Sequence, residues 1–211
     1  MGQDPDASGP ARIRLGLFGG TFDPPHHGHL AVARDVADAL ALDRVLWIPA
    51  GEPPHKSDQE LTATTLRLEM VRAATAGHAM FDVSEVEVDR AGPSYTVDTL
   101  RSFRGTFPDA SLFFIIGADE YRALESWRGP EQVLDLAHLA VMDRDGARAE
   151  DEMPDVAGAD SVQFVPVGRI DISSTEIRRH VAAGHDVTDF VPAAVAAIIG
   201  REGLYAGRSP E

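Results

Sequence analysis

Apolar positions along the chain alternate between two spacings. In residues 13–18 every second side chain is apolar, which indicates a short buried strand that runs into a pair of glycines. In residues 28–42 apolar side chains recur every three or four positions, which is typical of an amphipathic helix. A second apolar run over 45–49 ends at proline and glycine. The first part of the chain therefore predicts a strand, a helix and a second strand.

The same alternation continues through the rest of the chain. It predicts helices through Leu66, Met70 and Ala74, over 96–103, through Val133 and Leu136, over 174–183 and over 192–201, and strands over 81–88, 112–116, 139–142 and 162–167. A break in phase between Val83 and Val86 predicts a bulge or kink in the third strand. The polar stretch 143–160 predicts a mobile surface loop. Repeated strand and helix pairs predict an α/β fold with a doubly wound parallel sheet.

The composition is that of one domain. With 211 residues and 44% apolar content the chain has enough material for one substantial core, which we place at residues 12–205, with a small C-terminal helical part. Residues 1–11 are expected to be a disordered tail and 206–211 a second tail. Cysteine is absent, which excludes disulfides and thiolate metal sites.

Charge and hydropathy exclude further classes. The formal net charge of -15 argues against a general nucleic-acid partner, because phosphate backbones require a broad basic surface. The longest apolar runs are too short to span a bilayer, and no targeting segment is visible, so we expect a cytoplasmic protein with no membrane partner. The oligomeric state stays open, a homo-oligomer included.

The first candidate site is the segment GGTFDPPHHGHL, residues 19–30, where the first strand gives way to the first helix. Ligands of open parallel sheets bind at such carboxyl ends. Gly19 and Gly20 allow a close approach of the backbone to an anion, and a helix start attracts negative charge. His26 and His29 are three positions apart, so one helical face would point both rings at the same anion.

Two other interpretations compete for this segment. Three histidines in four residues are compatible with a transition-metal site, but Asp23 is the only nearby carboxylate and two prolines constrain it. A general dinucleotide-binding fold would require G-x-G-x-x-G after the strand, where this chain has GGTFDP. An anion site therefore remains the favoured interpretation.

The second candidate site is ISSTEIRR, residues 172–179, between the last strand and a helix. Ser173 or Ser174 suits the N-cap of that helix, with Glu176 or Ile177 three positions later. Capping does not explain Arg178. An arginine one turn into a helix, beside hydroxyl groups, makes a second anion site that can hold a triphosphate.

The two motifs resemble those of the nucleotidyltransferases with an H-x-G-H signature, here residues 26–29, and within them the bacterial nicotinate-nucleotide adenylyltransferases. The resemblance runs from about Arg14 to Tyr205 and includes PPHK at 53–56, PSYT at 93–96 and GAD at 117–119. It implies a Rossmann-like nucleotidyltransferase fold. It also implies transfer of AMP from ATP to nicotinate mononucleotide in NAD biosynthesis, giving nicotinate adenine dinucleotide and pyrophosphate, with Mg²⁺ held mainly by substrate phosphates and water.

The resemblance also assigns roles to particular residues. Catalysis falls to His26, His29 and Arg178. ATP and its phosphates fall to Gly19, Gly20, Thr21, Phe22, Lys56, Gly117, Asp119, Ile172, Ser173, Ser174 and Thr175. The nicotinate group falls to Tyr95, Thr96 and Trp127. Lys56, the only lysine of the chain, would neutralise phosphate, and Asp119 would bind a ribose hydroxyl. On composition alone, Trp127 is more readily a packing residue.

Other functions and two departures remain open. Nicotinamide mononucleotide and phosphopantetheine are alternative acceptors, and a nucleotide-binding regulator without turnover is a different class. The chain has Arg144, Asp145 and Gly146 where the family pattern predicts R-P-G, which puts the positioning of adenine in doubt. It also has Ile198 where the pattern predicts tyrosine, a change expected to alter packing only.

Overall fold

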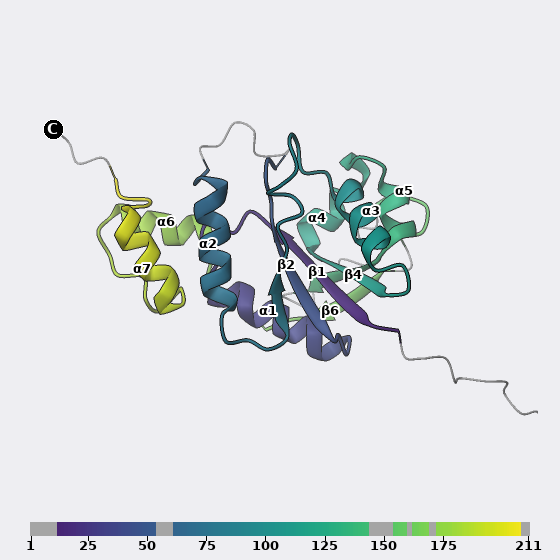
Figure 1. The fold of residues 1–211 in the computed structure, drawn as a ribbon, viewed down its shortest axis with the longest axis horizontal. Coiled ribbons are helices and arrows are strands. Elements are labelled where there is room, and N and C mark those ends of the chain that lie inside the picture. Colours follow the sequence, from purple (N-terminus) through teal and green to yellow (C-terminus); the bar gives the residue numbers. More distant parts are fainter. Residues whose placement is uncertain (1–11, 54–60, 144–153, 160–161, 169–171, 208–211) are drawn as a thin grey trace, which may run out of the picture.

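The computed structural model describes residues 12–53, 61–143, 154–159, 162–168 and 172–207. Its strands form one parallel sheet in the order β3-β2-β1-β4-β5-β6, of which Figure 1 shows β2, β1 and β4 next to one another. The strands are β1 (Arg14–Gly20), β2 (Arg44–Pro49), β3 (Phe81–Val83), β4 (Ser111–Gly117), β5 (His138–Asp143) and β6 (Gln163–Pro166). The order reverses between β1 and β4, which defines a switch point for ligand binding at the carboxyl ends of these strands. The predicted doubly wound sheet is confirmed.

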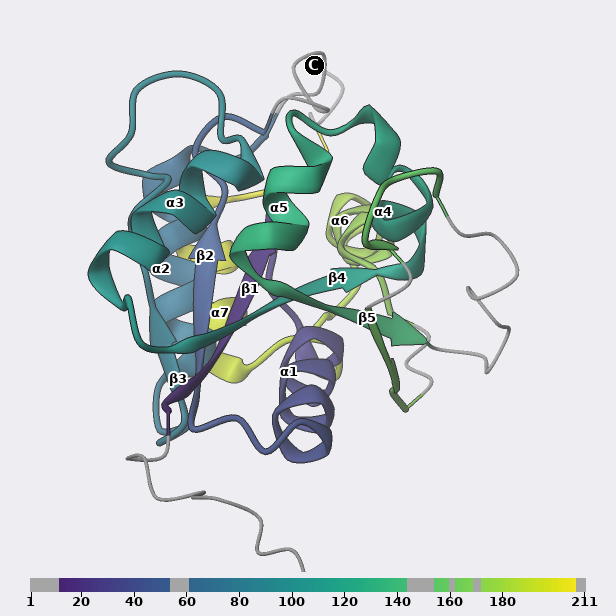
Figure 2. The same cartoon turned by 90° about the vertical axis from the view of Figure 1, so that its right-hand side faces the viewer.

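Helices cover both faces of the sheet. They are α1 (His27–Ala39), α2 (Thr64–Thr75), α3 (Thr96–Thr106), α4 (Ala118–Arg122), the 3₁₀ turn η2 (Leu124–Ser126), α5 (Pro130–Leu136), α6 (Ser174–Ala182) and α7 (Ala193–Glu202). Leu15 and Leu17 of β1 pack in the cluster that contains α3 and α5, and Phe18 packs in the cluster that contains α1. Figure 2 shows α3 and α5 on one side of the sheet and α1 on the other.

The C-terminal helices form a small unit beyond α2. A third apolar cluster joins Met70 and Ala74 of α2 to Ile177 of α6 and to Val195 and Ile199 of α7. Figure 1 shows α6 and α7 lying outside the sheet, next to α2. The predicted C-terminal helical part therefore has its own core and shares only α2 with the sheet. Within the described ranges, no helix is both long and apolar enough to cross a membrane.

The predicted third strand over 81–88 is too long. The strand ends at Val83, and Ser84 donates the last ladder hydrogen bond, to the Trp47 carbonyl at 2.8 Å. Because β3 is an edge strand and pairs only with β2, it stops near the end of that partner. The chain then turns, with the Asp89 amide donating to the Glu85 carbonyl at 2.9 Å. The break in apolar phase thus marks the end of a strand and not a bulge within one.

The polar stretch 143–160 is only partly a surface loop. Residues 144–153 and 160, with Arg144, Asp145 and Gly146 among them, lie outside the described residues. Val156 and Ala159 are buried in the core beside α4, and the Tyr121 hydroxyl donates to the Ala159 carbonyl at 2.9 Å. For residues 154–159 the prediction of a mobile loop is wrong, because two apolar side chains anchor them.

A buried arginine joins three loops at the carboxyl edge of the sheet. Arg67 of α2 is 1% exposed and donates to the carbonyls of Thr21, Gly51 and Thr62 at 2.9, 3.1 and 2.9 Å, and to the Thr64 hydroxyl at 3.0 Å. Burial lowers the pKa of Arg67 from its usual value, and the nearby charge of Asp23 opposes that shift. The planar guanidinium reaches separate carbonyls at once, as a lysine ammonium cannot.

Replacing this arginine should destabilise the protein strongly. A lysine in place of Arg67 cannot donate to the carbonyls of Thr21, Gly51 and Thr62 at once, and we expect the free energy of unfolding of Arg67→Lys to fall by about 2–3 kcal/mol. Denaturation by urea measures this change. Arg72→Lys, on the exposed side of the same helix where Arg72 pairs with Glu85, is the matched control and should change stability by less than about 0.5 kcal/mol. Equal losses in the two variants would contradict the role given to Arg67.

Candidate active site

The loop between β1 and α1 carries the two predicted histidines side by side. His26 is the N-cap residue of α1 and His29 lies in its first turn, and their ring centroids are 3.7 Å apart. The His26 backbone amide donates to Nδ1 of His29 at 3.2 Å. Because Nδ1 accepts a hydrogen bond, the proton of the neutral His29 ring lies on Nε2, which makes Nε2 a donor. Both rings line one cavity, as the spacing predicts.

Aromatic side chains hold His29 in this orientation. The Phe22 ring meets His29 edge to face at 5.1 Å between centroids, and Phe18 and Trp47 lie within 6.4 Å. Phe22 is 3% exposed and has a left-handed backbone φ of 50°. A Cβ on Gly20 would lie 2.9 Å from the Phe22 ring, so a glycine is required here by the packing of Phe22.

The second motif lies directly against the first. Arg178 of α6 donates to the Asp23 carbonyl at 2.8 Å and to the Thr175 hydroxyl at 3.3 Å, and the Ser174 hydroxyl donates to the Pro24 carbonyl at 2.8 Å. Ser173 is the N-cap residue of α6 and forms a capping box with Glu176. The two predicted anion sites are therefore one site, since segments about 150 residues apart in sequence share hydrogen bonds.

These elements enclose a cavity of about 740 Å³ at the switch point between β1 and β4. This volume lies in the range of small-molecule sites. The predicted residues on its wall are Gly19, Gly20, Thr21, Phe22, His26, His29, Thr96, Gly117, Asp119, Trp127, Ile172, Ser174, Thr175 and Arg178. Ser173 is not on the wall, because its side chain caps α6, and Lys56 lies outside the described residues. A second hollow of about 430 Å³, beside α2 and β3, contains none of the predicted residues.

The wall opposite the histidines is built by α3 and η2. Thr96 is the first residue of α3, and Trp127 follows η2 with its ring edge to face against Phe114 at 6.2 Å. The Tyr95 side chain is not on the wall: its partly buried ring packs against the core and lies 4.7 Å from the Arg128 guanidinium above it. The structure brings Thr96 and Trp127 to the cavity and leaves Tyr95 behind them as support.

Charge on the described cavity wall is mainly acidic. Arg178 is the only arginine or lysine among the described lining residues, whereas Asp23, Glu87, Asp119 and Glu120 are all present. The Asp119 side chain is 96% exposed and pairs with Arg122 at 2.8 Å. A carboxylate in that position can accept hydrogen bonds from ligand hydroxyl groups, as expected for Asp119.

Sequence patterns gave no indication of Glu87, a buried carboxyl on the cavity wall. Glu87 is 8% exposed and accepts a hydrogen bond from the Thr99 hydroxyl at 2.7 Å. Burial raises its pKa, against the opposing effects of hydrogen bonds from Thr99 and Ser94 and of the charge of Arg90. Ser94 also accepts from the Gly51 amide at 3.1 Å, so Glu87 connects the start of α3 to the loop after β2. Glu87 lies in a turn, where no periodicity marks burial.

The two motifs that the sequence predicts to bind anions thus lie together at the switch point of a doubly wound sheet, as expected for a nucleotidyltransferase. The model of the family described as cytidylyltransferase-like matches residues 17–180, and the chain belongs to that family. A probable nicotinate-nucleotide adenylyltransferase of Thermus thermophilus is 45% identical over 193 residues, covering 92% of this chain and all of the relative. One of Thermomicrobium roseum is 44% identical over 197 residues, covering 91% of each chain.

Within this class, the chain belongs to the nicotinate-nucleotide adenylyltransferases, which are enzymes. Among solved structures, the nicotinic acid mononucleotide adenylyltransferase of Plasmodium falciparum complexed with NaAD is similar, with a TM-score of 0.74 and 17% identity. The similarity covers 92% of this chain and 98% of that one, and it shows that the two share a fold.

The burial of Glu87 predicts a pH dependence of stability. Because its pKa is raised by folding, its contribution to the free energy of unfolding is fully present below the ordinary value of about 4.3 and is lost as pH rises through the raised value. Glu87→Gln removes this titration. Relative to the wild type, the variant should therefore gain stability as pH rises from about 4.3 through the raised pKa of Glu87, measured by urea denaturation at a series of pH values. Parallel stability curves would contradict the burial of a titrating carboxyl.

Proposed function

We propose that this enzyme transfers the AMP part of ATP to nicotinate mononucleotide, giving nicotinate adenine dinucleotide and pyrophosphate. The observation that carries this proposal is the cavity itself. One wall combines His26, His29 and Arg178 for phosphate groups, and the opposite wall offers Thr96 at a helix start and the Trp127 ring. The relatives named above bear the name of this activity, and the Plasmodium structure contains its dinucleotide product.

The reaction requires alignment and charge stabilisation rather than a protein nucleophile. The phosphate of the acceptor has a second pKa of about 6 and is a dianion at neutral pH. One of its oxygens attacks the α-phosphorus of ATP, the bond from the α-phosphorus to the bridging oxygen breaks, and pyrophosphate leaves. No proton has to be removed from the nucleophile, so the protein contributes positioning and hydrogen-bond donors.

The donors come from both motifs. His29 lines the cavity at the N-terminal end of α1, which favours negative charge, and Nε2 is the ring nitrogen that carries the proton when Nδ1 accepts from the His26 amide. Arg178 is held by the Asp23 carbonyl and the Thr175 hydroxyl, which orients its guanidinium before substrate binds. Donors fixed in this way cost little reorganisation when charge moves from the α-phosphate to the leaving pyrophosphate.

A magnesium ion would arrive with ATP. In the described part of the chain no group of three histidine or acidic residues is arranged to hold a metal. Mg²⁺ keeps several water ligands and is commonly bound through substrate phosphates. When bound, it would neutralise part of the triphosphate charge, which suits a described wall with Arg178 as its only arginine and four carboxylates. Asp119 and Glu120 lie on that wall within the first turn of α4.

The acceptor fits the opposite wall. A flat pyridine ring can stack on Trp127, whose own orientation is fixed by Phe114. The ring carboxylate would then lie near Thr96 at the start of α3, where the helix dipole favours a negative charge over a neutral amide. This arrangement predicts preference for nicotinate over nicotinamide mononucleotide.

Release of pyrophosphate tests the reaction. With ATP and Mg²⁺ present, nicotinate mononucleotide, nicotinamide mononucleotide and phosphopantetheine are offered separately. We expect release with the nicotinate compound to exceed that with the nicotinamide compound by about tenfold or more in kcat/KM, equivalent to about 1.4 kcal/mol for one charge at a helix start. Preference for either other acceptor would overturn the acceptor pocket but leave the phosphate site. No release with any of them would reject the reaction.

Removal of the His29 ring tests the catalytic assignment. His29→Ala should lower kcat by about a hundredfold or more, because a donor to the developing charge is lost, while the KM for ATP changes by less than about fivefold. His27→Ala is the matched control, since His27 belongs to the same motif but is exposed and away from the cavity wall, and its kcat should stay within about twofold of the wild type. A nucleotide-binding regulator would instead lose affinity and response in parallel.

A further inference from the structure

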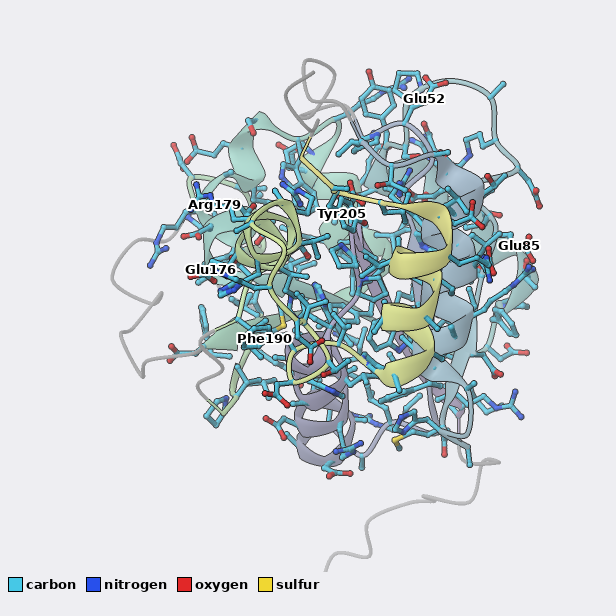
Figure 3. The ribbon with its side chains drawn as sticks, turned by 90° about the vertical axis from the view of Figure 1, so that its left-hand side faces the viewer. Glu52, Glu85, Glu176, Arg179, Phe190 and Tyr205 are labelled. Atoms are coloured by element: carbon cyan, nitrogen blue, oxygen red, sulfur yellow. The ribbon has the colours of Figure 1, made fainter. Side chains whose placement is uncertain are left out.

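The C-terminal unit holds the histidine loop by side-chain and backbone hydrogen bonds. Besides the bonds from Arg178 and Ser174 already described, the His27 amide donates to the Phe190 carbonyl at 2.9 Å. The Tyr205 hydroxyl donates to Oδ1 of Asp23 at 2.5 Å. Figure 3 shows Tyr205 between α6 and α7, in the segment that follows α7. Residues from 174 to 205 therefore contact residues 23–27, the segment just before and at the start of α1.

This loop depends on partners from outside itself. Pro24 and Pro25 have no backbone N–H, so this part of the loop cannot be held by donors of its own. The polar anchors at Asp23 and Pro24 are their carbonyl groups and the Asp23 carboxylate, which are acceptors, whereas the His27 amide at the start of α1 donates to the Phe190 carbonyl. Donors must come from other segments, and Asp23 receives one from the Thr62 amide at 3.1 Å and one from Tyr205.

The Asp23 carboxylate requires these donors, because it is 3% exposed. Loss of a hydrogen-bond donor to a buried carboxylate raises the free energy of the folded state, so positions of the donor that keep the bond are favoured. Burial, and then the bond to Asp23, raise the pKa of Tyr205, which keeps its hydroxyl protonated and donating at all ordinary pH values. The Tyr205 hydroxyl is therefore available as a donor to Asp23 over the whole pH range in which the enzyme would be assayed.

Tyr205 has a backbone conformation that a tyrosine does not favour, which indicates that other interactions, such as its hydrogen bond to Asp23, hold it there. Its φ is 62°, in the left-handed region that a bulky side chain rarely adopts. Such a conformation persists when surrounding interactions determine it. The hydrogen bond to Asp23 is one such interaction, and it carries the side chain away from the end of α7 toward the cavity loop.

We propose that Tyr205 is a positioning residue for adenylyl transfer: through Asp23, its hydroxyl fixes the loop that places His26 and His29 against the substrate phosphates. This inference rests on the proposed function for its catalytic readout. Tyr205 itself is not on the cavity wall, and it acts through Asp23, three residues before His26. The C-terminal end of the chain thereby becomes part of the machinery that aligns the reaction.

Tyr205→Phe tests the proposal, because it removes only the hydroxyl. We expect kcat to fall about tenfold while the KM values for ATP and acceptor change by less than about threefold, since a small displacement of aligned groups costs rate more than binding. Tyr121→Phe is the matched control. It removes a buried hydroxyl that donates to the Ala159 carbonyl, away from this loop, and should leave kcat within about twofold.

Hydrogen exchange supplies a readout that does not depend on the reaction. Amides of residues 22–29, followed by mass spectrometry of their peptides, should exchange faster in Tyr205→Phe than in the wild type, with no change there in Tyr121→Phe. A loss of kcat in both variants, in proportion to their loss of thermal stability, would show a merely structural effect and overturn the proposal. Unchanged kcat and unchanged exchange in Tyr205→Phe would also overturn it.

A double-mutant cycle tests whether the effect passes through Asp23. If Tyr205 acts through this carboxylate, Asp23→Asn combined with Tyr205→Phe should lower kcat no further than the more damaging single change, with circular dichroism used to verify folding. Multiplicative losses would contradict the coupling. If nicotinate mononucleotide is not turned over by the wild type, the proposed function fails, while the exchange experiment still decides whether Tyr205 holds the loop.

Discussion

The guanidinium of Arg67 is the constraint on which the geometry of the active site depends. It is buried among the loops that follow β1 and β2 and the start of α2, and it donates to a carbonyl of each. Removing such a cation from water is unfavourable unless its donors are satisfied, and here they are. The bonds join the loop that carries the histidines to the loop after β2, whose Gly51 amide donates to the Ser94 hydroxyl. One side chain of α2 therefore joins loops that border the cavity.

Preorganisation then extends outward from this centre in two directions. On the side of the sheet, aromatic packing around Phe22 and Trp47 fixes the His29 ring, while its Nδ1 accepts from the His26 amide. On the side of the C-terminal unit, α6 and Tyr205 hold the carbonyls and carboxylate of the loop. Both sets of contacts therefore restrict the position of the same side chain, His29. A reaction that needs no general base gains its rate from this kind of fixed alignment.

Electrostatics in this protein are local rather than global. The chain carries a formal net charge of -15, and its substrates are themselves anionic. The long-range electrostatic interaction between the protein and its substrates is therefore repulsive, and salt screens most of this repulsion beyond about 8 Å. Arg178, His26, His29 and the start of α1 lie on the cavity wall, so they would act on a bound anion at contact distance, where screening is weak. Glu87 is a buried carboxyl that accepts a hydrogen bond from Thr99 of α3, and not an exposed charge.

The sequence by itself determined the features that are encoded locally. The spacing of apolar residues predicted the order of strands and helices, and hence the parallel sheet, because each kind of element buries its apolar residues at its own fixed spacing. The two phosphate motifs could be placed at the ends of strands, since residue types and spacing carry that chemistry. The one local signal overlooked was Arg67, an arginine on the same helical stripe as Met70, Val71 and Ala74.

Only the tertiary structure decided which side chains meet. The Tyr205 and Asp23 contact joins residues 182 positions apart, and no pattern near either residue specifies the other. The same holds for Tyr95, which packs under Arg128 behind the wall, and for Glu87, whose burial follows from a turn beyond a short edge strand. The spacing of apolar residues indicates whether a side chain is buried or exposed. Which side chain it contacts depends on how elements distant in sequence pack together.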